Sequence, residues 1–459
     1  MTLIKSISGI RGTIGGSIGD GLSPIDTVKF ASAYAVWLQQ QNPDKKLRVV
    51  VGHDARISGK MVSQLVCGTL MGCGVDVVDA DLATTPTVEM AVTFNHADGG
   101  IILTASHNPK QWNALKLLNG KGEFLSAADG EALLSIAEKN DFSYAFIDDI
   151  GKYSQQSFTE QHIQAVLSHP LVDVEAVRNA GFKVVVDAVN SVGGVVIPAL
   201  LEKMGASCVK LYCEPNGEFP HNPEPLPEHL TEISAMVKQE KADLGIVVDP
   251  DVDRLALVCE NGEMFGEEYT LVAVADYVLS QKKGNTVSNL SSSRALRDIT
   301  EKHGGEYFAS AVGEVNVVAM MKEKSAVIGG EGNGGIIMPD LHYGRDALIG
   351  VALFLTHLAK HNKKVSELRA EYPPYFISKN KLKLTPDTNM DALLDKVKKH
   401  FSAEKINDTD GVRIDFEQDK KWVHLRKSNT EPIIRIYAEA STIELANELA
   451  EQVKQVLKE

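Results

Sequence analysis

The chain has 459 residues, of which 44% are hydrophobic and 24% charged, a balance typical of a globular protein with several cores. Its net charge of −14 argues against a nucleic-acid-binding protein, which carries a basic face, but not against an anionic substrate held in a local basic pocket. Five cysteines without a CxxC pair, no signal-peptide core and no apolar run near the roughly 18 residues of a membrane helix together favour a cytoplasmic protein with reduced thiols.

Short runs of apolar, mostly β-branched residues recur along the chain, and each is followed by a polar loop. They cover 47–51, 100–103, 183–186, 243–248 and 325–328, with helix-length segments between them. Runs without polar alternation predict strands buried on both faces of a sheet that helices cover. We therefore predict three similar α/β domains in series, with ligands bound beyond the carboxyl ends of the strands.

The texture of the sequence changes after the proline-rich stretch 371–375. The segments 411–416 and 422–426 alternate between apolar and polar residues, which predicts half-exposed strands of a smaller α+β domain. The chain ends in a predicted helix, with Ser441 and Glu444 as its capping box. One face of this helix carries an apolar packing stripe: Leu445, Leu449, Val453 and Val456.

The first motif that suggests chemistry is Thr104-Ala105-Ser106-His107-Asn108-Pro109. It places a serine on a sharp turn between a strand and a helix-stopping Asn-Pro, so the hydroxyl of Ser106 is a candidate nucleophile. Lys116 lies ten positions later and would move a proton there if it were desolvated. The alternatives are a serine that only bonds a nearby backbone N–H and a lysine at the surface.

The segment Asp249-Pro250-Asp251-Val252-Asp253-Arg254 offers three hard oxygen ligands on one loop, which favours Mg²⁺. A phosphate on Ser106 would complete the coordination shell, and Arg254 would neutralise that phosphate. A solvated acidic turn is one alternative. A calcium loop is another, with Glu260 as its last ligand, but Arg254 stands where that loop needs glycine and both flanks are strand-like.

Two later loops suggest recognition of a sugar phosphate. In the glycine-rich segment 329–335, Glu331 and Asn333 suit sugar hydroxyls better than phosphate, and the Lys-Ser/Thr of a nucleotide loop is missing. The segment from Arg426 to Arg435 gathers basic and small polar side chains, which suits a dianionic phosphate. Each loop, taken alone, is also consistent with an ordinary structural turn.

Taken in order, these motifs resemble the α-D-phosphohexomutase superfamily over essentially the whole chain. Ser8-Gly9-Ile10-Arg11-Gly12, which alone would only suggest a surface charge, resembles its N-terminal loop, and residues 104–109 resemble its phosphoserine loop. Residues 214–225 are similar to its second-domain signature, and residues 249–254 resemble its metal loop. Residues 331–335 stand where its sugar-binding loop belongs, and residues 426–435 resemble its phosphate-binding loop.

The resemblance implies four domains around a central cleft, namely three similar α/β domains with mixed sheets at 1–152, 153–254 and 255–370, and a smaller α+β domain at 371–459. It implies a phosphoserine mechanism with Mg²⁺ and with a hexose 1,6-bisphosphate as intermediate and activator. The metal ligands it implies are Ser106, Asp249, Asp251 and Asp253. The groups it implies around the reacting phosphate are Arg11, Ser106, His107, Lys116 and Arg254. The substrate-binding residues it implies are Glu331, Asn333, Arg426, Ser428, Asn429, Thr430 and Arg435.

Two departures bear on the substrate. Glu314 stands where many members have histidine, and the sugar loop reads Glu-Gly-Asn-Gly-Gly instead of Glu-x-Ser-Gly-His. Both are similar to a branch of phosphoglucosamine mutase and phosphoglucomutase-type enzymes with relaxed sugar preference. We expect interconversion of glucosamine 6-phosphate and glucosamine 1-phosphate; the alternative is a mutase for mannose or glucose phosphates. A phosphatase and a silent sugar-phosphate binder are the rival functions. We expect no nucleic-acid or membrane partner, and a monomer or homodimer.

Overall fold

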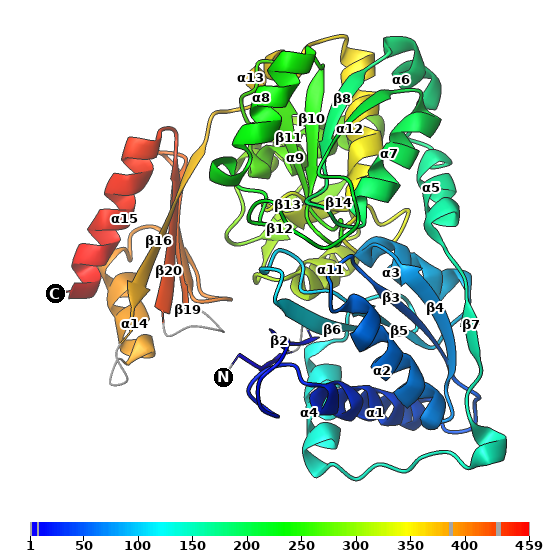
Figure 1. The fold of residues 1–459 in the computed structure, drawn as a ribbon. Coiled ribbons are helices and arrows are strands. Elements are labelled where there is room, and N and C mark those ends of the chain that lie inside the picture. The colour runs from blue at the N-terminus through cyan, green and yellow to red at the C-terminus, as the bar shows by residue number, and fades with distance from the viewer. Residues whose placement is uncertain (1, 7–8, 385–388, 428–432, 459) are drawn as a thin grey trace. The chain divides into compact units, whose positions relative to one another are not determined.

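The computed structural model describes residues 2–6, 9–384, 389–427 and 433–458, which form two compact units with hydrophobic cores of their own (Figure 1). The first unit comprises Met1–Glu267 and Gly335–Ser366, and the second comprises Glu268–Gly334 and Glu367–Glu459. Among the residues so described, every helix is too short or too polar to cross a membrane.

The first unit begins with a mixed sheet of seven strands, and they are β1 (Ile4–Ser6), β2 (Gly9–Thr13), β3 (Arg48–His53), β4 (Asp76–Leu82), β5 (Gly99–Leu103), β6 (Trp112–Leu118) and β7 (Tyr153–Gln155). Their order in the sheet is β1-β2-β6-β5-β3-β4-β7. β3 runs parallel to β4 and β5, whereas β6 runs antiparallel to β5 and β2. Parallel neighbours need long crossovers, which accounts for the helix-length segments between the apolar runs.

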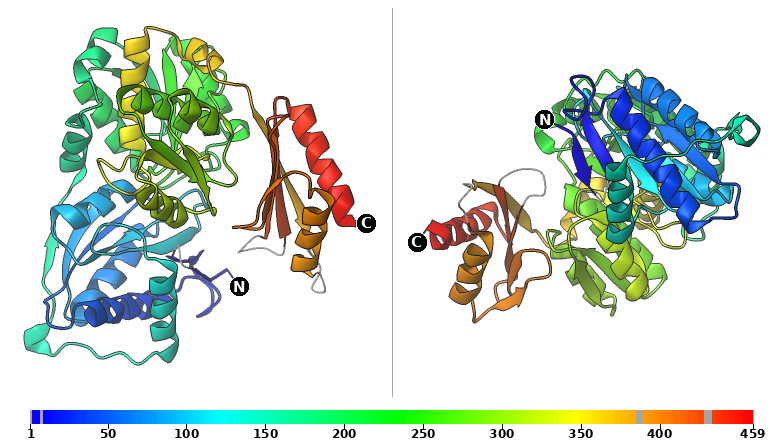
Figure 2. Two further views of the ribbon diagram at one scale, coloured as in Figure 1. Left: turned by 180° about the vertical axis from the view of Figure 1, so that it is seen from behind. Right: turned by 90° about the horizontal axis from the view of Figure 1, so that it is seen from below.

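Four helices cover both faces of this sheet, and they are α1 (Pro24–Gln41), α2 (Gly59–Gly72), α3 (Thr85–Phe94) and α4 (Ala127–Lys139) (Figure 2). Val49 and Val51 share one core with Phe30 of α1. Val50, which points to the opposite face, shares another core with Val88 of α3. Burial on both faces explains why the run has no polar alternation, as the sequence predicts.

A second sheet in the first unit has four strands, and they are β8 (Lys183–Asp187), β9 (Ser207–Leu211), β10 (Leu244–Val248) and β11 (Leu255–Cys259). Their order is β11-β10-β8-β9, with only β10 and β11 antiparallel. The helices of this region are α5 (Thr159–Leu167), α6 (Val174–Ala180), α7 (Gly193–Met204), α8 (Thr231–Glu240) and α12 (Ala347–His361), and β15 (Gly335–Ile337) leads toward α12. β10 lies between β11 and β8, and all of its residues are buried. The loop after β10 therefore starts in the interior of the sheet rather than at its edge.

The second unit contains a parallel arrangement in which β12 (Asn285–Asn289) pairs with β13 (Tyr307–Ser310) and β14 (Ala326–Glu331). Its helices are α9 (Glu267–Gln281), α10 (Ala295–Lys302) and α11 (Glu314–Glu323), and α13 (Val365–Ala370) follows α12. A loop after β14 therefore leaves the carboxyl end of a parallel strand, which is where open α/β sheets bind ligands.

The C-terminal part of the second unit is an antiparallel sheet in the order β16-β20-β19-β18-β17. Its strands are β16 (Phe376–Lys383), β17 (Lys405–Asn407), β18 (Val412–Phe416), β19 (Lys421–Lys427) and β20 (Ile433–Ala440), and its helices are α14 (Met390–His400) and α15 (Ile443–Lys458). Val397 of α14 and Val453 of α15 share one core with the sheet, so both helices cover the same face (Figures 1 and 2). The predicted α+β domain and the predicted mixed α/β sheets are thus confirmed.

The predicted start of α15 is wrong in detail. The sequence predicts a capping box from Ser441 and Glu444, but the residue that caps the helix is Thr442, whose hydroxyl accepts the backbone N–H of Leu445 at 3.3 Å. Leu445 lies in this first turn and is 46% exposed, so it leaves the predicted apolar stripe. The other members of the stripe are buried: Leu449, Val453 and Val456. The strand before the helix ends at Ala440, and the two-residue turn that follows sets the cap one position later.

Candidate active site

Ser106 lies on a strained turn directly after β5. Its φ of 48° is left-handed, a conformation that costs free energy for a residue other than glycine. The turn is held from inside, because the N–H of Ser106 donates to the hydroxyl of Thr104 at 3.0 Å and that hydroxyl donates to Asp54 at 2.6 Å. The strained backbone thus persists because a buried hydrogen-bond network holds it, and this backbone conformation sets the direction of the serine hydroxyl.

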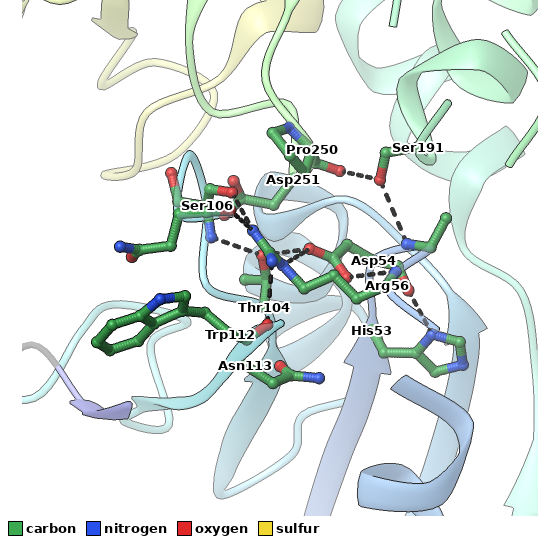
Figure 3. A network of polar contacts seen from close by, with 12 residues as sticks. His53, Asp54, Arg56, Thr104, Ser106, Trp112, Asn113, Ser191, Pro250 and Asp251 are labelled. Carbon is green, nitrogen blue, oxygen red and sulfur yellow. Dashed lines mark hydrogen bonds and ion pairs between the residues drawn. The ribbon is translucent and has the colours of Figure 1, made fainter. Parts of the chain in front are cut away.

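Arg56 is the centre of this network (Figure 3). Its guanidinium, with the residue only 2% exposed, donates to four backbone carbonyls of the serine loop, at 2.5 Å to Ser106, 2.6 Å to Asn108, 2.8 Å to Pro109 and 3.0 Å to Trp112. Its Nε donates to Asp54 at 3.1 Å, which balances the charge. Sequence reasoning missed Arg56, although the polar loop after β3 lies at the same sheet edge as the serine turn.

The three aspartates lie in the turn between β10 and β11, and none is accessible to solvent. One carboxylate oxygen of each lies within 4.8 Å of the others. Val252 adopts a left-handed φ of 63°, and Asp249 accepts the N–H groups of Asp253 at 3.2 Å and Arg254 at 3.1 Å, so the loop curls around its own carboxylates.

This geometry excludes the calcium-loop alternative. The flanking segments β10 and β11 are antiparallel strands rather than helices. Glu260, the supposed last ligand, instead accepts the N–H and the hydroxyl of Ser366. A 12-residue calcium loop needs both the flanking helices and that last carboxylate.

The serine and the aspartate loop meet, although 143 positions separate them in the sequence. The hydroxyl of Ser106 donates to Asp249 Oδ2 at 2.8 Å. Burial, and next the charges of Asp253 and Asp251, raise the pKa of Asp249 well above its usual range. Three carboxylates crowded beyond the reach of water repel one another, and a divalent cation would relieve that repulsion.

Two cations already hold part of this charge. Lys116 Nζ lies 2.7 Å from Asp251 and 3.5 Å from Asp253, and Arg345 Nη2 lies 2.6 Å from Asp253. Burial alone would lower the pKa of Lys116, but Asp251 and Asp253 outweigh it and raise this pKa. Lys116 is therefore a positive charge held beside Asp251 and Asp253 rather than a general base. Arg345 was not among the residues found from the sequence, since it precedes α12 far from every predicted motif.

Positively charged side chains act on His107, whose Nδ1 lies 3.4 Å from the hydroxyl of Ser106. The charge of Arg254, next burial, and then the charges of Arg11 and Arg345 together lower the pKa of His107 to about 2. Burial and the charge of Arg254 also lower the pKa of Arg11, so the guanidinium groups are close enough to act on one another. A neutral imidazole among three guanidinium groups is an environment that favours a dianion such as a phosphoryl group.

In the second unit, Glu331 lies at the end of β14 and is buried. Its Oε1 accepts the side-chain amide of Asn289 at 2.8 Å and the N–H of Gly313 at 3.1 Å. Asn333 lies in the turn that follows, and Glu314 is the first residue of α11. The carboxylate of Glu331 is thus held in one orientation by its neighbours, as a recognition group needs to be.

The predicted phosphate loop lies partly within the described residues. Arg426 of β19 is directly opposite Arg435 of β20, and Arg435 is directly opposite Lys381 of β16. Opposed residues share a sheet face, so three cations form a row across neighbouring strands, which is destabilising without an anion. Asp410 lies 3.3 Å from Arg426. The other predicted residues of this loop lie outside the described residues: Ser428, Asn429 and Thr430.

Comparison with known proteins identifies the family of the chain. Family models for phosphoglucomutase/phosphomannomutase match all four domains, with the alpha/beta/alpha domains I, II and III at residues 3–144, 160–262 and 266–375, and the C-terminal domain at 381–456. A phosphoglucomutase/phosphomannomutase of Thermococcus kodakarensis is 36% identical over 98% of both chains. The chain belongs to the phosphoglucomutase/phosphomannomutase family.

Two further relatives show the range of this family. A probable phosphoglucosamine mutase of Pyrococcus abyssi is 34% identical over 90% of both chains. The crystal structure of a phosphoglucomutase/phosphomannomutase family protein of Burkholderia thailandensis is 26% identical, with a TM-score of 0.86 over 100% of this chain and 98% of that one. The relatives therefore agree on the fold and the family, and their names differ in the sugar.

We predict that Arg56→Lys lowers kcat for phosphohexomutase turnover by about 100-fold, the cost of moving a reacting group by about 1 Å. Lysine keeps the charge but cannot donate to four carbonyls, and each unpaired carbonyl costs about 1–3 kcal/mol of stability. KM should change little if Arg56 acts only through the serine loop. Arg48→Lys, at the exposed start of the same strand, is the matched control and should retain both kcat and the melting temperature. Steady-state kinetics with equal kcat for the two variants would contradict the positioning role.

Proposed function

We propose that this protein is a phosphohexomutase that interconverts glucosamine 6-phosphate and glucosamine 1-phosphate through a phosphoserine at Ser106. The observation that carries the proposal is the 2.8 Å contact between the hydroxyl of Ser106 and Asp249, which is one of three clustered and buried carboxylates. A serine hydroxyl beside a candidate cation site and several guanidinium groups has what phosphoryl transfer needs, namely a nucleophile and charge stabilisation.

The residues present fit a Mg²⁺ ion. Asp249, Asp251 and Asp253 offer hard oxygens within 4.8 Å of one another, and burial, followed by the charges of Asp253 and Asp251, raises the pKa of Asp249. Together with the oxygen on Ser106 they would hold the ion, which would supply charge neutralisation for the phosphoryl group. Lys116 and Arg345 would keep the outer carboxylate oxygens in place through their contacts with Asp251 and Asp253.

The proposed chemistry balances without a further reactant. The oxygen of a sugar hydroxyl bonds to the phosphorus on Ser106, the bond between phosphorus and Ser106 Oγ breaks, and the proton of the sugar hydroxyl is taken up overall by Oγ. The sugar now carries phosphates at positions 1 and 6. In the second step Ser106 Oγ bonds to the phosphorus at the other position, the bond between that phosphorus and its sugar oxygen breaks, and the proton on Oγ passes to that sugar oxygen. The isomer is released and Ser106 is phosphorylated again.

The remaining predicted residues receive roles in this scheme. Arg11, His107 and Arg254 would contact the moving phosphoryl group, because His107 lies 3.4 Å from the hydroxyl of Ser106 and the charges of Arg254 and Arg11 act on His107. The phosphate that does not move would be bound on the C-terminal sheet by Arg426 and Arg435, which belong to the row of cations, together with the predicted loop residues Ser428, Asn429 and Thr430. Lys381, which faces Arg435, joins this set.

The setting of the enzyme is also part of the proposal. All five cysteines are free thiols, which is consistent with a reducing cytoplasm. The sequence predicts domain boundaries at 152, 254 and 370. Because β7 pairs with β4 and β11 pairs with β10, we propose that the first two boundaries lie after Gln155 and after Cys259, and that the four domains divide phosphoserine, metal, sugar and phosphate binding among them. A monomer or homodimer remains the predicted state.

Ser106→Ala should lower mutase turnover by at least about 1,000-fold, the scale expected for loss of a covalent nucleophile. Ser126→Ala is a matched control, because Ser126 only caps α4 by accepting the N–H of Asp129. Product analysis by NMR should show a hexose 6-phosphate forming from the 1-phosphate with no free phosphate. Release of inorganic phosphate at the same rate would favour the phosphatase alternative, and full mutase activity in Ser106→Ala would falsify the nucleophile assignment.

The sugar is the less constrained part of the proposal. The P. abyssi relative is named a probable phosphoglucosamine mutase, whereas the T. kodakarensis relative is named for glucose and mannose phosphates. Glu331, whose Oε1 is held by Asn289 and Gly313, would accept from the ammonium group of glucosamine. It would also accept from a hydroxyl, so a glucose or mannose phosphate mutase is the second candidate.

We predict a higher kcat/KM for glucosamine 6-phosphate than for glucose 6-phosphate and mannose 6-phosphate, with measurable turnover of all three. Glu331→Gln keeps an acceptor for Asn289 but removes the charge, so it should reduce the preference for glucosamine by roughly 10-fold, the scale of one charged hydrogen bond. Glu323→Gln, an exposed glutamate on α11, serves as the control. A preference for glucose or mannose in the unmodified protein would select the second candidate.

A further inference from the structure

A cluster of two histidines and one aspartate lies in the first unit, and it is separate from the cluster of Asp249, Asp251 and Asp253. His162 is on α5, His342 is in the segment between β15 and α12, and Asp346 is the residue that caps α12. His162 and Asp346 are fully buried, and the side chain of His342 is 12% exposed. We call these three residues the imidazole–carboxylate cluster.

Both imidazoles of this cluster contact the same carboxylate oxygen, Asp346 Oδ2. His162 Nε2 lies 2.9 Å from Asp346 Oδ2, and His342 Nε2 lies 3.2 Å from the same oxygen. In a tetrahedral zinc site with bonds of about 2.0–2.1 Å, neighbouring ligand atoms lie about 3.3 Å apart. The two imidazole–carboxylate separations are shorter than that value by about 0.4 and 0.1 Å, and all three ligand atoms lie within 4.8 Å of one another, so a small outward movement of Asp346 admits an ion.

Two of the three ligands, His162 and Asp346, are oriented by a hydrogen bond at their other atom, and His342 has a carboxylate nearby. His162 Nδ1 lies 2.9 Å from the hydroxyl of Thr87, and His342 Nδ1 lies 3.4 Å from Glu89. Asp346 Oδ1 accepts the N–H of Leu348 at 2.8 Å, so Oδ2 is the oxygen that faces both imidazoles. Metal-binding histidines are oriented in this way, with the remote nitrogen on a hydroxyl or carboxylate partner.

The backbone of the segment 342–346 holds two of the three ligands in place. Any side chain at Gly344 would collide with the carboxylate of Glu89, so glycine allows the segment 342–346 to close over α3. The backbone of that segment is fixed at both ends, as His342 N–H donates to Met338 at 3.1 Å and Asp346 N–H donates to Ile336 at 2.8 Å. The ligands are therefore ordered before any ion arrives, which reduces the cost of binding.

From this convergence we propose that His162, His342 and Asp346 bind a divalent transition-metal ion of the Zn²⁺ class. Two imidazoles and one carboxylate select such ions over Mg²⁺, which prefers oxygen ligands alone. Asp346 and the nearby Glu89 supply two negative charges for a doubly charged ion. The partly exposed His342 marks the side from which the ion enters, and a water or another small ligand fills the fourth position.

The site would join α3, α5 and the segment before α12, elements that are far apart in the sequence (Figure 1). Arg345, between two of these residues, contacts Asp253 at 2.6 Å, and Thr85 at the start of α3 donates to Asp251 at 2.6 Å. The ion therefore stabilises the elements behind the aspartate loop. The proposal does not depend on the mutase assignment, because it concerns binding alone.

The test uses the whole chain, stripped of metal with a chelator and then held in excess Mg²⁺ to saturate the oxygen-only site. After one equivalent of Zn²⁺ and removal of unbound ion, elemental analysis should find about one Zn²⁺ per chain, with a rise in melting temperature. His162→Gln and His342→Gln should each lose both effects. His221→Gln, which removes a comparable His–Asp pair (3.0 Å to Asp187), should retain them.

Co²⁺ gives a second measurement that needs no variant. In excess Mg²⁺, Co²⁺ bound to imidazoles in a four-coordinate site should give intense visible absorption in the unmodified protein, and Zn²⁺ should abolish it. Absence of this absorption together with no retained Zn²⁺ would overturn the proposal even if the histidine variants failed to fold. Equal Zn²⁺ retention by a folded His162→Gln variant would also overturn it, since the ion would then lie elsewhere.

Discussion

Three carboxylates held out of reach of water are the constraint on which the rest of the first unit depends. Asp249, Asp251 and Asp253 cannot all be ionised in such a place without cations. Lys116 from the first sheet and Arg345 from the segment before α12 supply two of them. The folding of the first sheet, the second sheet and that distant segment into one unit thus satisfies a single electrostatic requirement, and a divalent cation would complete it.

The second constraint is the strained serine turn. Ser106 adopts a left-handed backbone that nothing local favours, and Arg56 compensates by donating to four carbonyls of the same loop. A rigid, buried support of this kind keeps the hydroxyl at hydrogen-bond distance from Asp249 rather than free to rotate into solvent. The free energy that the strain costs is offset in the scaffold, where it does not interfere with the reacting group.

Sequence reasoning found the residues that act at loop tips and missed those that act through tertiary contacts. Ser106 and the three aspartates follow apolar strand runs, and in a sheet with parallel strands the ends of such runs share an edge. Arg345 and His162 carry no such signal, because an isolated arginine or histidine looks the same in sequence whether it is buried or exposed. Arg56 does follow an apolar run, but its sequence does not show that its side chain turns inward to the serine loop. The sequence predicts the cap of α15 one residue too early, at Ser441 instead of Thr442, for a related reason: the length of the preceding strand sets where the helix begins.

The central claim is that Ser106 carries the phosphoryl group that moves. The most direct measurement is peptide mass spectrometry of the protein after brief treatment with a hexose 1,6-bisphosphate, before and after addition of a hexose 6-phosphate. The account predicts one phosphate on the peptide that contains Ser106, and its transfer to the sugar in Mg²⁺ but not in excess chelator. Phosphate on another residue, or transfer that proceeds unchanged in the chelator, would contradict it.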